Sequence, residues 1–233
     1  MVKFSIIIAT HNNEKYIVEA IASVINQTFK EWELIIVNDK STDNTENKIK
    51  SFLKDKRIKL INNEKQLGVG ASRNIGVKNI SSKFFGDLDG DDCLHPKAIE
   101  IMYDAHCKYP KAGMIYSQFM HCDIKMNPIK IGYCKDIPKN MTNLEANKVS
   151  HFRTYKLQYF NKTAGFHEIV MKAIDKDISF KMEEVSELKF INSVLYFYRN
   201  HPEGISQYKN NKAWQSGKIV RKEAKERRGI SDE

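Results

Sequence analysis

With 233 residues, this chain is long enough for one large domain rather than two full ones. Its composition, 41% hydrophobic and 29% charged, excludes intrinsic disorder over most of the length. No apolar run approaches the roughly 20 residues of a membrane-spanning helix, and residues 1–9 lack the features of a signal peptide. The net charge of +9 indicates an anionic partner. The four cysteines form no C-x-x-C pair, so we expect reduced thiols in a cytoplasmic protein.

The first half of the chain alternates strand-like and helix-like segments. Residues 4–9 form a near-continuous β-branched run, which is typical of a strand inside a parallel sheet. Ile17, Ile21, Val24 and Ile25 lie at helical spacing and predict a helix that crosses back over this sheet. The alternation then repeats, which predicts an α/β fold. Further strands are expected at 32–37, 58–61 and 83–85, with helices at 42–53 and 71–79.

A second series of elements follows an acidic cluster at 87–92. Pro96 is well placed for the first turn of a helix that ends near Tyr109. Residues 123–147 lose the regular pattern, and we interpret them as a loop-rich excursion rather than a domain boundary. The remaining expected elements are a strand at 114–120, a helix at 177–188, a strand at 190–198 and a basic helix at 213–228.

Polar clusters follow three of the expected strands, at residues 9–13, 38–43 and 87–92. Ligands bind outside the carboxyl ends of the strands in an open parallel sheet, so these clusters are expected to converge on one edge. No glycine occurs between Met1 and Gly68, which argues against a nicotinamide cofactor, and the P-loop pattern is absent.

The acidic cluster contains the run Asp89-Gly-Asp-Asp92. Hard divalent cations prefer carboxylate oxygens, and two aspartates at a strand end can share one ion. Gly90 allows a tight turn there. The alternative is a solvated acidic turn, or the N-cap of the helix that begins near Pro96.

Several of these segments resemble family 2 glycosyltransferases with the GT-A fold. The likeness to their nucleotide-sugar half lies in residues 6–17, 22–28, 33–45, 68–76 and 88–92. Farther on, the chain resembles the transferase units of bacterial chondroitin polymerase and related capsule-polymer synthases at 151–153, 165–168 and 173–177.

The resemblance implies a single α/β domain with a Rossmann-like, mostly parallel central sheet flanked by helices. Residues 1–120 would form the nucleotide-sugar half, 121–208 the acceptor and catalytic half, and 209–233 a basic helical tail. The implied activity is the metal-dependent transfer of a sugar with inversion at its anomeric carbon. The expected donor is a UDP-sugar, and the acceptor is a hydroxyl of a glycan or lipid-linked glycan in surface polysaccharide synthesis.

The resemblance also implies roles for individual residues. Thr10 and Asp39 would contact the nucleobase, with Asn12 beside them, while Arg73 would lie near the nucleotide and Asp89 near the ribose and phosphates. The remaining implied roles are Asp91 as main ligand of Mn²⁺ or Mg²⁺, His201 as a further metal or diphosphate contact, Asp175 as general base, and His151, His167 and Glu168 on the acceptor side. Each histidine also has a purely structural interpretation.

Physical chemistry is consistent with these roles. A divalent cation neutralises charge on a nucleoside diphosphate leaving group, and a carboxylate that takes the proton of the acceptor contributes about 10²–10⁴-fold. Asp175 and Asp177 lie about 200° apart on a helix, so both cannot face one atom, and Asp175 is chosen. Without the resemblance, both would be explained as acidic residues at a helix N-terminus.

The basic helix at 213–228 predicts peripheral contact with an anionic membrane, or else a solvated basic face. Two other functions remain as alternatives. One is a nucleic-acid-binding protein or a DNA-modifying glycosyltransferase, suggested by the net charge, although no recognition motif is present. The other is a catalytically silent nucleotide-sugar-binding protein, against which the intact Asp89, Asp91 and Asp175 argue.

Overall fold

The structure, a computed structural model, describes residues 1–170, 172–202, 204 and 211–231, with the side chains of 211–214 excepted. The helices are α1 (Ile17–Ile25), α2 (Thr45–Lys50), α3 (Val69–Lys78), α4 (Ala98–Lys108), α5 (Asn143–Ala146), α6 (Leu157–Phe160), α7 (Ile174–Val185) and α8 (Asn211–Arg227). The strands are β1 (Phe4–Thr10), β2 (Trp32–Asn38), β3 (Ile58–Asn62), β4 (Phe84–Asp89), β5 (Cys93–Leu94), β6 (Ala112–Cys122), β7 (Pro128–Ile131), β8 (Arg153–Lys156) and β9 (Glu187–Arg199).

The described strands form one sheet in the order β3-β2-β1-β4-β8-β6-β9-β5, with β7 paired to the last residues of β6. The first four strands of this order are parallel, as expected from their buried, β-branched sequences. The short strand β8 is antiparallel to both β4 and β6, and it thereby joins the two halves of the sheet. The sheet is therefore parallel in residues 1–89 and mixed beyond them.

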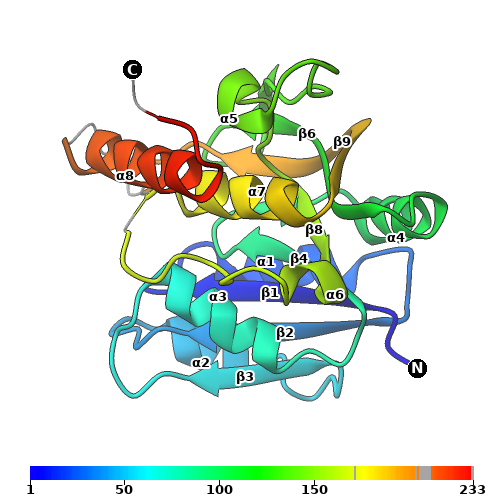
Figure 1. Cartoon of the computed structure of the whole chain (residues 1–233). Coiled ribbons are helices and arrows are strands. Elements are labelled where there is room, and N and C mark those ends of the chain that lie inside the picture. The colour runs from blue at the N-terminus through cyan, green and yellow to red at the C-terminus, as the bar shows by residue number, and fades with distance from the viewer. Residues whose placement is uncertain (171, 203, 205–210, 232–233) are drawn as a thin grey trace.

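The core lies between this sheet and helices packed against it. Every side chain of β2 is buried, as is nearly all of β1. In Figure 1, α3 lies over β1 and β2, while α7 lies over the half of the sheet that contains β6 and β9. Gly76 lets α3 approach closely, because a Cβ there would lie 2.4 Å from Cγ2 of Ile7.

The polar clusters at 9–13, 38–43 and 87–92 lie at the carboxyl ends of neighbouring parallel strands. Thr10 pairs with Asn38 across β1 and β2, and Ala9 pairs with Asp89 across β1 and β4. The carboxyl ends of these strands therefore lie side by side, as the sequence predicts. The N-terminus of α7 approaches the same edge from the second half of the chain, since Asp175 contacts Arg73 of α3.

The second half differs in detail from the expected elements. Helix α7 begins at Ile174, three residues before the expected start, because Ala173 takes a φ of 63° and starts the helix there. The segment expected to be loop-rich contains β7 and the single-turn helix α5, which a capping box between Thr142 and Glu145 stabilises. The expected boundary between the acceptor half and the tail, at residue 208, lies outside the described residues.

None of the helices in the described part of the chain combines the length and the apolar character that a membrane span requires.

Candidate active site

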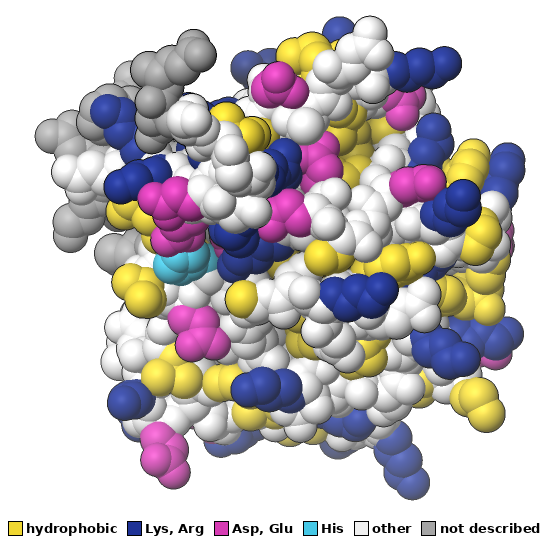
Figure 2. Space-filling model, viewed as in Figure 1, with side chains coloured by type: hydrophobic (Ala, Val, Ile, Leu, Met, Phe, Trp, Pro, Cys, Tyr) yellow, Lys and Arg dark blue, Asp and Glu magenta, His cyan; other side chains and the backbone are white. Residues whose placement is uncertain are grey.

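A cavity of about 680 Å³ opens at the carboxyl edge of the parallel strands. In Figure 2, acidic and basic side chains lie side by side along the junction between the α7 and α8 layer and α3. Of the residues proposed from the sequence, those that line the cavity are Thr10, Asn12, Asp39, Arg73, Asp89, Asp91, Glu168, Asp175 and His201.

Asp39 fixes the loop that leads into α3. Its carboxylate accepts hydrogen bonds of 2.8 Å from the backbone N–H groups of Leu67 and Gly68, and one of 2.7 Å from Asn63. Gly68 has a φ of 91°, a conformation that favours glycine. Burial raises the pKa of Asp39, but these hydrogen bonds outweigh it and hold the pKa below its usual range. The floor of the cavity therefore carries a fixed negative charge.

Thr10 and Asn12 connect the ends of β1 and β2. The carbonyl of Thr10 accepts a hydrogen bond of 2.8 Å from the backbone N–H of Asp39. Asn12 has a φ of 51°, and its Oδ1 accepts a hydrogen bond of 2.8 Å from the backbone N–H of Thr42. The two loops thus hold each other in place around the cavity.

The three aspartates of the acidic turn have different environments. Asp92 is buried and accepts hydrogen bonds of 2.7 Å from the Tyr196 hydroxyl and from the backbone N–H of Arg199, so it anchors the turn to β9. Asp89 contacts Arg73 at 2.6 Å, and Asp91 faces the cavity. The alternative of a merely solvated acidic turn is not what the structure shows.

Asp91 and His201 bring two possible metal ligands together. Oδ2 of Asp91 lies 2.9 Å from Nε2 of His201, whose ring packs 4.7 Å from that of Tyr16. The buried Nδ1 of His201 has no hydrogen-bond partner among the described residues. No group of three or more acidic, histidine or cysteine side chains gathers as a metal site in the described part of the chain. The pair fits Mn²⁺ or Mg²⁺ if phosphate oxygens and water supply the other ligands.

Two buried arginines hold the carboxylates on the other side of the cavity. Arg73 of α3 contacts Asp89 at 2.6 Å and Asp175 at 3.0 Å, while Arg153 of β8 contacts Asp87 at 2.5 Å and Asp175 at 3.1 Å. Both arginines reach the same oxygen of Asp175, Oδ1. Among the described residues, neither arginine forms a hydrogen bond to its other oxygen, Oδ2.

This network sets the ionisation of Asp175. Burial raises the pKa of Asp175, but the Arg153 and Arg73 guanidiniums outweigh it and hold the pKa well below its usual range. The side chain is still 40% exposed, so its carboxylate remains accessible from the cavity. In contrast, burial and the neighbouring carboxylates raise the pKa of Asp89 to about 6, despite the contact with Arg73.

Asp177 points away from the cavity. It is fully buried and pairs with Lys181 at 2.6 Å, one turn farther along α7. The helical spacing of Asp175 and Asp177 indicates that only one of them faces the site, and the structure shows that it is Asp175.

The three residues expected on the acceptor side lie in different surroundings. Glu168 lines the cavity and accepts a hydrogen bond of 2.9 Å from Asn74. His151 does not line it, because its ring is buried between Tyr196 at 4.5 Å and Tyr198 at 5.6 Å, and burial lowers its pKa to about 3.

His167 is likewise not among the residues that line the cavity. Its Nδ1 accepts hydrogen bonds from the backbone N–H groups of Ile169 and Val170, and Nε2 lies 3.4 Å from Glu223 of α8. The side chain therefore stabilises the loop before α7.

The sequence did not assign a role to four residues that build the site. Arg153 was noticed only within a short H-F-R match, and Asp87, Tyr196 and Arg199 were not singled out. Arg199 donates to the carbonyl of Asp91 at 2.7 Å and so supports the turn from β9. Their contacts join distant parts of the sequence, and a local pattern carries no signal for them.

The sequence of this chain matches a known family. Residues 5–165 match the model described as glycosyl transferase family 2. The chain belongs to this family. It is therefore a glycosyltransferase, and the predicted resemblance is confirmed.

Curated relatives agree with this assignment. The chain is 32% identical over 203 residues to chondroitin synthase of Escherichia coli, covering 87% of this chain and 29% of that protein. It is 32% identical to an uncharacterized glycosyltransferase of Haemophilus influenzae, with 94% of this chain and 72% of the relative covered. A shorter match, 43% identical over 97 residues, is to UDP-Glc:alpha-D-GlcNAc-diphosphoundecaprenol beta-1,3-glucosyltransferase WfgD of Escherichia coli, covering 42% of this chain and 38% of the relative.

A solved structure shows the same fold. S. aureus TarS 1-349 in complex with UDP-GlcNAc superposes with a TM-score of 0.76 at 21% identity, covering 94% of this chain and 65% of that one. This likeness confirms the predicted GT-A fold, in which helices flank a curled mixed sheet. The chain spans 29% of the length of the chondroitin synthase that it matches.

Proposed function

We propose that this chain transfers a sugar from a UDP-sugar to a hydroxyl group of a glycan or lipid-linked glycan, with inversion at the anomeric carbon, in surface polysaccharide synthesis. The observation that carries the proposal is the arrangement of one cavity, which has the Asp91 and His201 pair on one side and Asp175, held by two arginines, on the other.

The donor would lie against residues 1–120 and the acceptor against 121–208. Thr10, Asn12 and Asp39 would receive the nucleoside, since they surround the end of the cavity at β1 and β2. Relatives support a uridine nucleotide, because TarS was crystallised with UDP and with UDP-GlcNAc, and the WfgD description names a UDP-Glc donor.

Asp91 and His201 would hold a divalent cation together with the diphosphate. When bound, such an ion neutralises charge on the leaving diphosphate. Asp89 and Arg73 would position the ribose and phosphates next to it. The free cysteines of the described chain support a reducing compartment, and we place the reaction in the cytoplasm.

Asp175 would accept the proton of the attacking hydroxyl. Its low pKa keeps the carboxylate ionised, and the two arginines on Oδ1 fix its orientation, so Oδ2 is left for the acceptor. Attack from the face opposite the diphosphate inverts the anomeric centre.

Thermal unfolding tests this function directly. The protein is heated with UDP, GDP, CDP, ADP or dTDP, each with and without Mn²⁺. A nucleotide at about 100 times its dissociation constant adds roughly 2.7 kcal/mol, or about 5–10 °C in a chain of this size. We expect UDP to act with Mn²⁺, Asp91→Ala to abolish the shift, and Asp136→Ala, an exposed carboxylate outside the cavity, to retain it. Absence of a shift with every nucleotide and metal would contradict the proposal.

A further inference from the structure

Exposed apolar side chains gather on one segment, residues 123–141, which contains β7 and the loop after it. Ile129 and Ile131 of β7 are 59% and 61% exposed, and Ile129 lies where the pairing of β7 with β6 shifts register. Tyr133 is 49% exposed, while Ile124 and Met141 are exposed toward the two ends of the segment. An edge strand with this much exposed apolar surface is typical of an interaction site.

The same segment carries unpaired positive charge. Its lysines, all of them exposed, form no ion pair among the described residues; they are Lys125, Lys130, Lys135 and Lys139. Neither acid of the segment forms an ion pair with these lysines. Asp123 accepts hydrogen bonds from the backbone N–H groups of Lys125 and Asn127 within its own turn, and Asp136 lies 3.5 Å from Lys189 of β9. The surface thus combines exposed aliphatic side chains with lysines that form no ion pair among the described residues.

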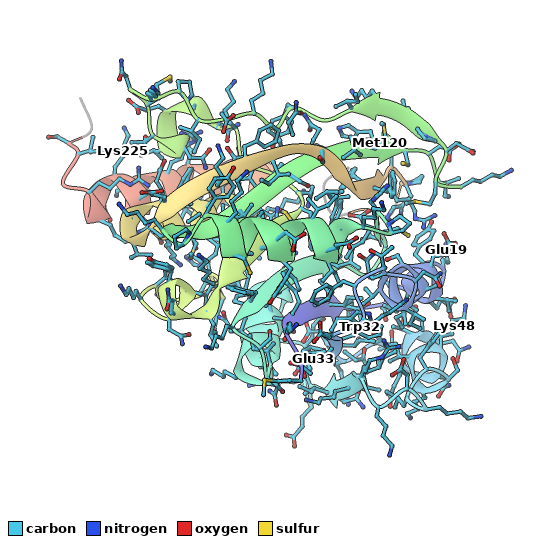
Figure 3. The ribbon with its side chains drawn as sticks, turned by 90° about the vertical axis from the view of Figure 1, so that its right-hand side faces the viewer. Glu19, Trp32, Glu33, Lys48, Met120 and Lys225 are labelled. Carbon is cyan, nitrogen blue, oxygen red and sulfur yellow. The ribbon has the colours of Figure 1, made fainter. Side chains whose placement is uncertain are left out.

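The basic helix α8, for which the sequence left membrane contact and a solvated basic face as alternatives, has a different character. Arg227 forms a two-point contact with Glu184, and Arg228 pairs with Glu183, both on α7. Val220 and Ala224 are buried against the rest of the protein. Figure 3 shows Lys225 of α8 and Met120, the β6 partner of Ile131, at opposite ends of the molecule, so the two basic surfaces can be tested separately.

We propose that residues 123–141 form a docking hairpin for an anionic lipid bilayer. The exposed isoleucines of β7 would enter the interface between headgroups and acyl chains, and the lysines around them would contact anionic headgroups. A protein partner that matched this surface would need an acidic and apolar face, whereas a bilayer of anionic lipid supplies both properties without specific contacts.

This docking would place the cavity next to the lipid surface. Tyr133 lies two residues beyond the end of β7. Its ring packs 5.8 Å from Phe119, which lies 6.3 Å from Tyr198 on the cavity wall. The hairpin and the acceptor side of the cavity therefore belong to one continuous part of the molecule.

Vesicle sedimentation tests the proposal with the full chain. Vesicles of phosphatidylcholine alone are compared with vesicles that also contain phosphatidylglycerol, at low and at high salt. We expect binding only to the anionic vesicles and release by salt. The variant pairs Ile129→Ser with Ile131→Ser, and Lys130→Glu with Lys135→Glu, should each lower the affinity by about ten-fold or more.

The matched control lies on α8. It combines Ile219→Ser with Lys222→Glu, which also replaces an exposed aliphatic side chain and an exposed lysine, and it should bind vesicles like the unchanged protein. Melting temperatures of all variants verify that they fold. Vesicle binding needs no donor, so failure here is distinct from failure of the proposed transfer. Equal binding by the hairpin variants, loss in the α8 control, no binding to anionic vesicles, or a dimer that the hairpin variants dissociate would each overturn the proposal.

Discussion

Arg73 of α3 donates a hydrogen bond of 3.0 Å to Asp175 of α7, 102 residues later in the chain. The contact joins the first half of the chain to the second, and Arg153 of β8 approaches the same carboxylate oxygen at 3.1 Å. The proposed base is therefore held by elements from both halves of the protein, and its chemistry depends on how these halves pack.

The charge network predicts different roles for Asp175 and Asp177. Asp175→Asn removes the proposed base, so we expect kcat for transfer to fall by about 10²–10⁴-fold while UDP still binds. Asp177→Asn breaks the buried pair with Lys181 and should lower the unfolding free energy with kcat retained. Steady-state kinetics and UDP titration of both variants measure this. A larger loss of kcat in Asp177→Asn would reverse the assignment.

Arg153 is predicted to be a positioning residue that also stabilises the fold. Arg153→Met leaves the buried Asp87 without its main partner, and we expect a loss of about 3–5 kcal/mol in the free energy of unfolding. Adding Asp87→Asn should recover part of this loss. Urea unfolding monitored by circular dichroism measures it, with Arg57→Met, which breaks a half-exposed pair with Asp55, as the control at about 1 kcal/mol or less. Equal losses in the two arginine variants would show that the network adds no stability.

Helix α3 packs so closely against the loop before α7 that one methyl group added at Gly70 should displace this loop. A Cβ at Gly70 would lie 1.9 Å from the carbonyl oxygen of His167, whereas a Cβ at Gly217 of α8 meets no atom within 4 Å. Gly70→Ala should displace the loop that carries Glu168 and weaken UDP binding. Gly217→Ala should leave binding unchanged and stabilise the protein by up to about 1 kcal/mol. Calorimetric titration and thermal unfolding distinguish them, and unchanged UDP affinity in Gly70→Ala would contradict the packing.

Two buried histidines predict that the free energy of unfolding decreases at acid pH. Burial lowers the pKa values of His106 and His151 to about 3, whereas an unfolded chain titrates near 6.5. The unfolded state therefore binds more protons between these values, so the stabilising contribution is complete above pH 6.5 and is lost as the pH falls toward 3. Each histidine should contribute a slope of at most about 1.4 kcal/mol per pH unit.

His106→Leu provides the test of this slope. His106 is remote from the cavity and stacks on Phe84 at 5.0 Å, so leucine keeps an apolar contact in its place. The unfolding free energy of the variant, measured by urea titration from pH 7 to pH 4, should decline less steeply than that of the unchanged protein. Identical slopes would mean that folding does not lower the pKa of His106.

The sequence alone determined the first half of the fold and the position of the site within it. Buried β-branched runs and helical spacing are local patterns, so β1, β2 and the polar clusters after them could be located, and parallel pairing then requires Thr10, Asn38 and Asp89 to meet at one edge. Helical spacing likewise separated Asp175 from Asp177.

The tertiary structure alone decided which side chains surround the cavity. Local sequence could not show that Arg153 reaches Asp175 and Asp87, or that His151 lies within an aromatic stack, because these contacts join strands that are distant in the chain. The composition of the C-terminal helix likewise indicated a free basic surface, whereas Arg227 pairs with Glu184. The sequence alone shows which residues are charged and how they are spaced. Whether a charge is neutralised depends on which residues folding places beside it.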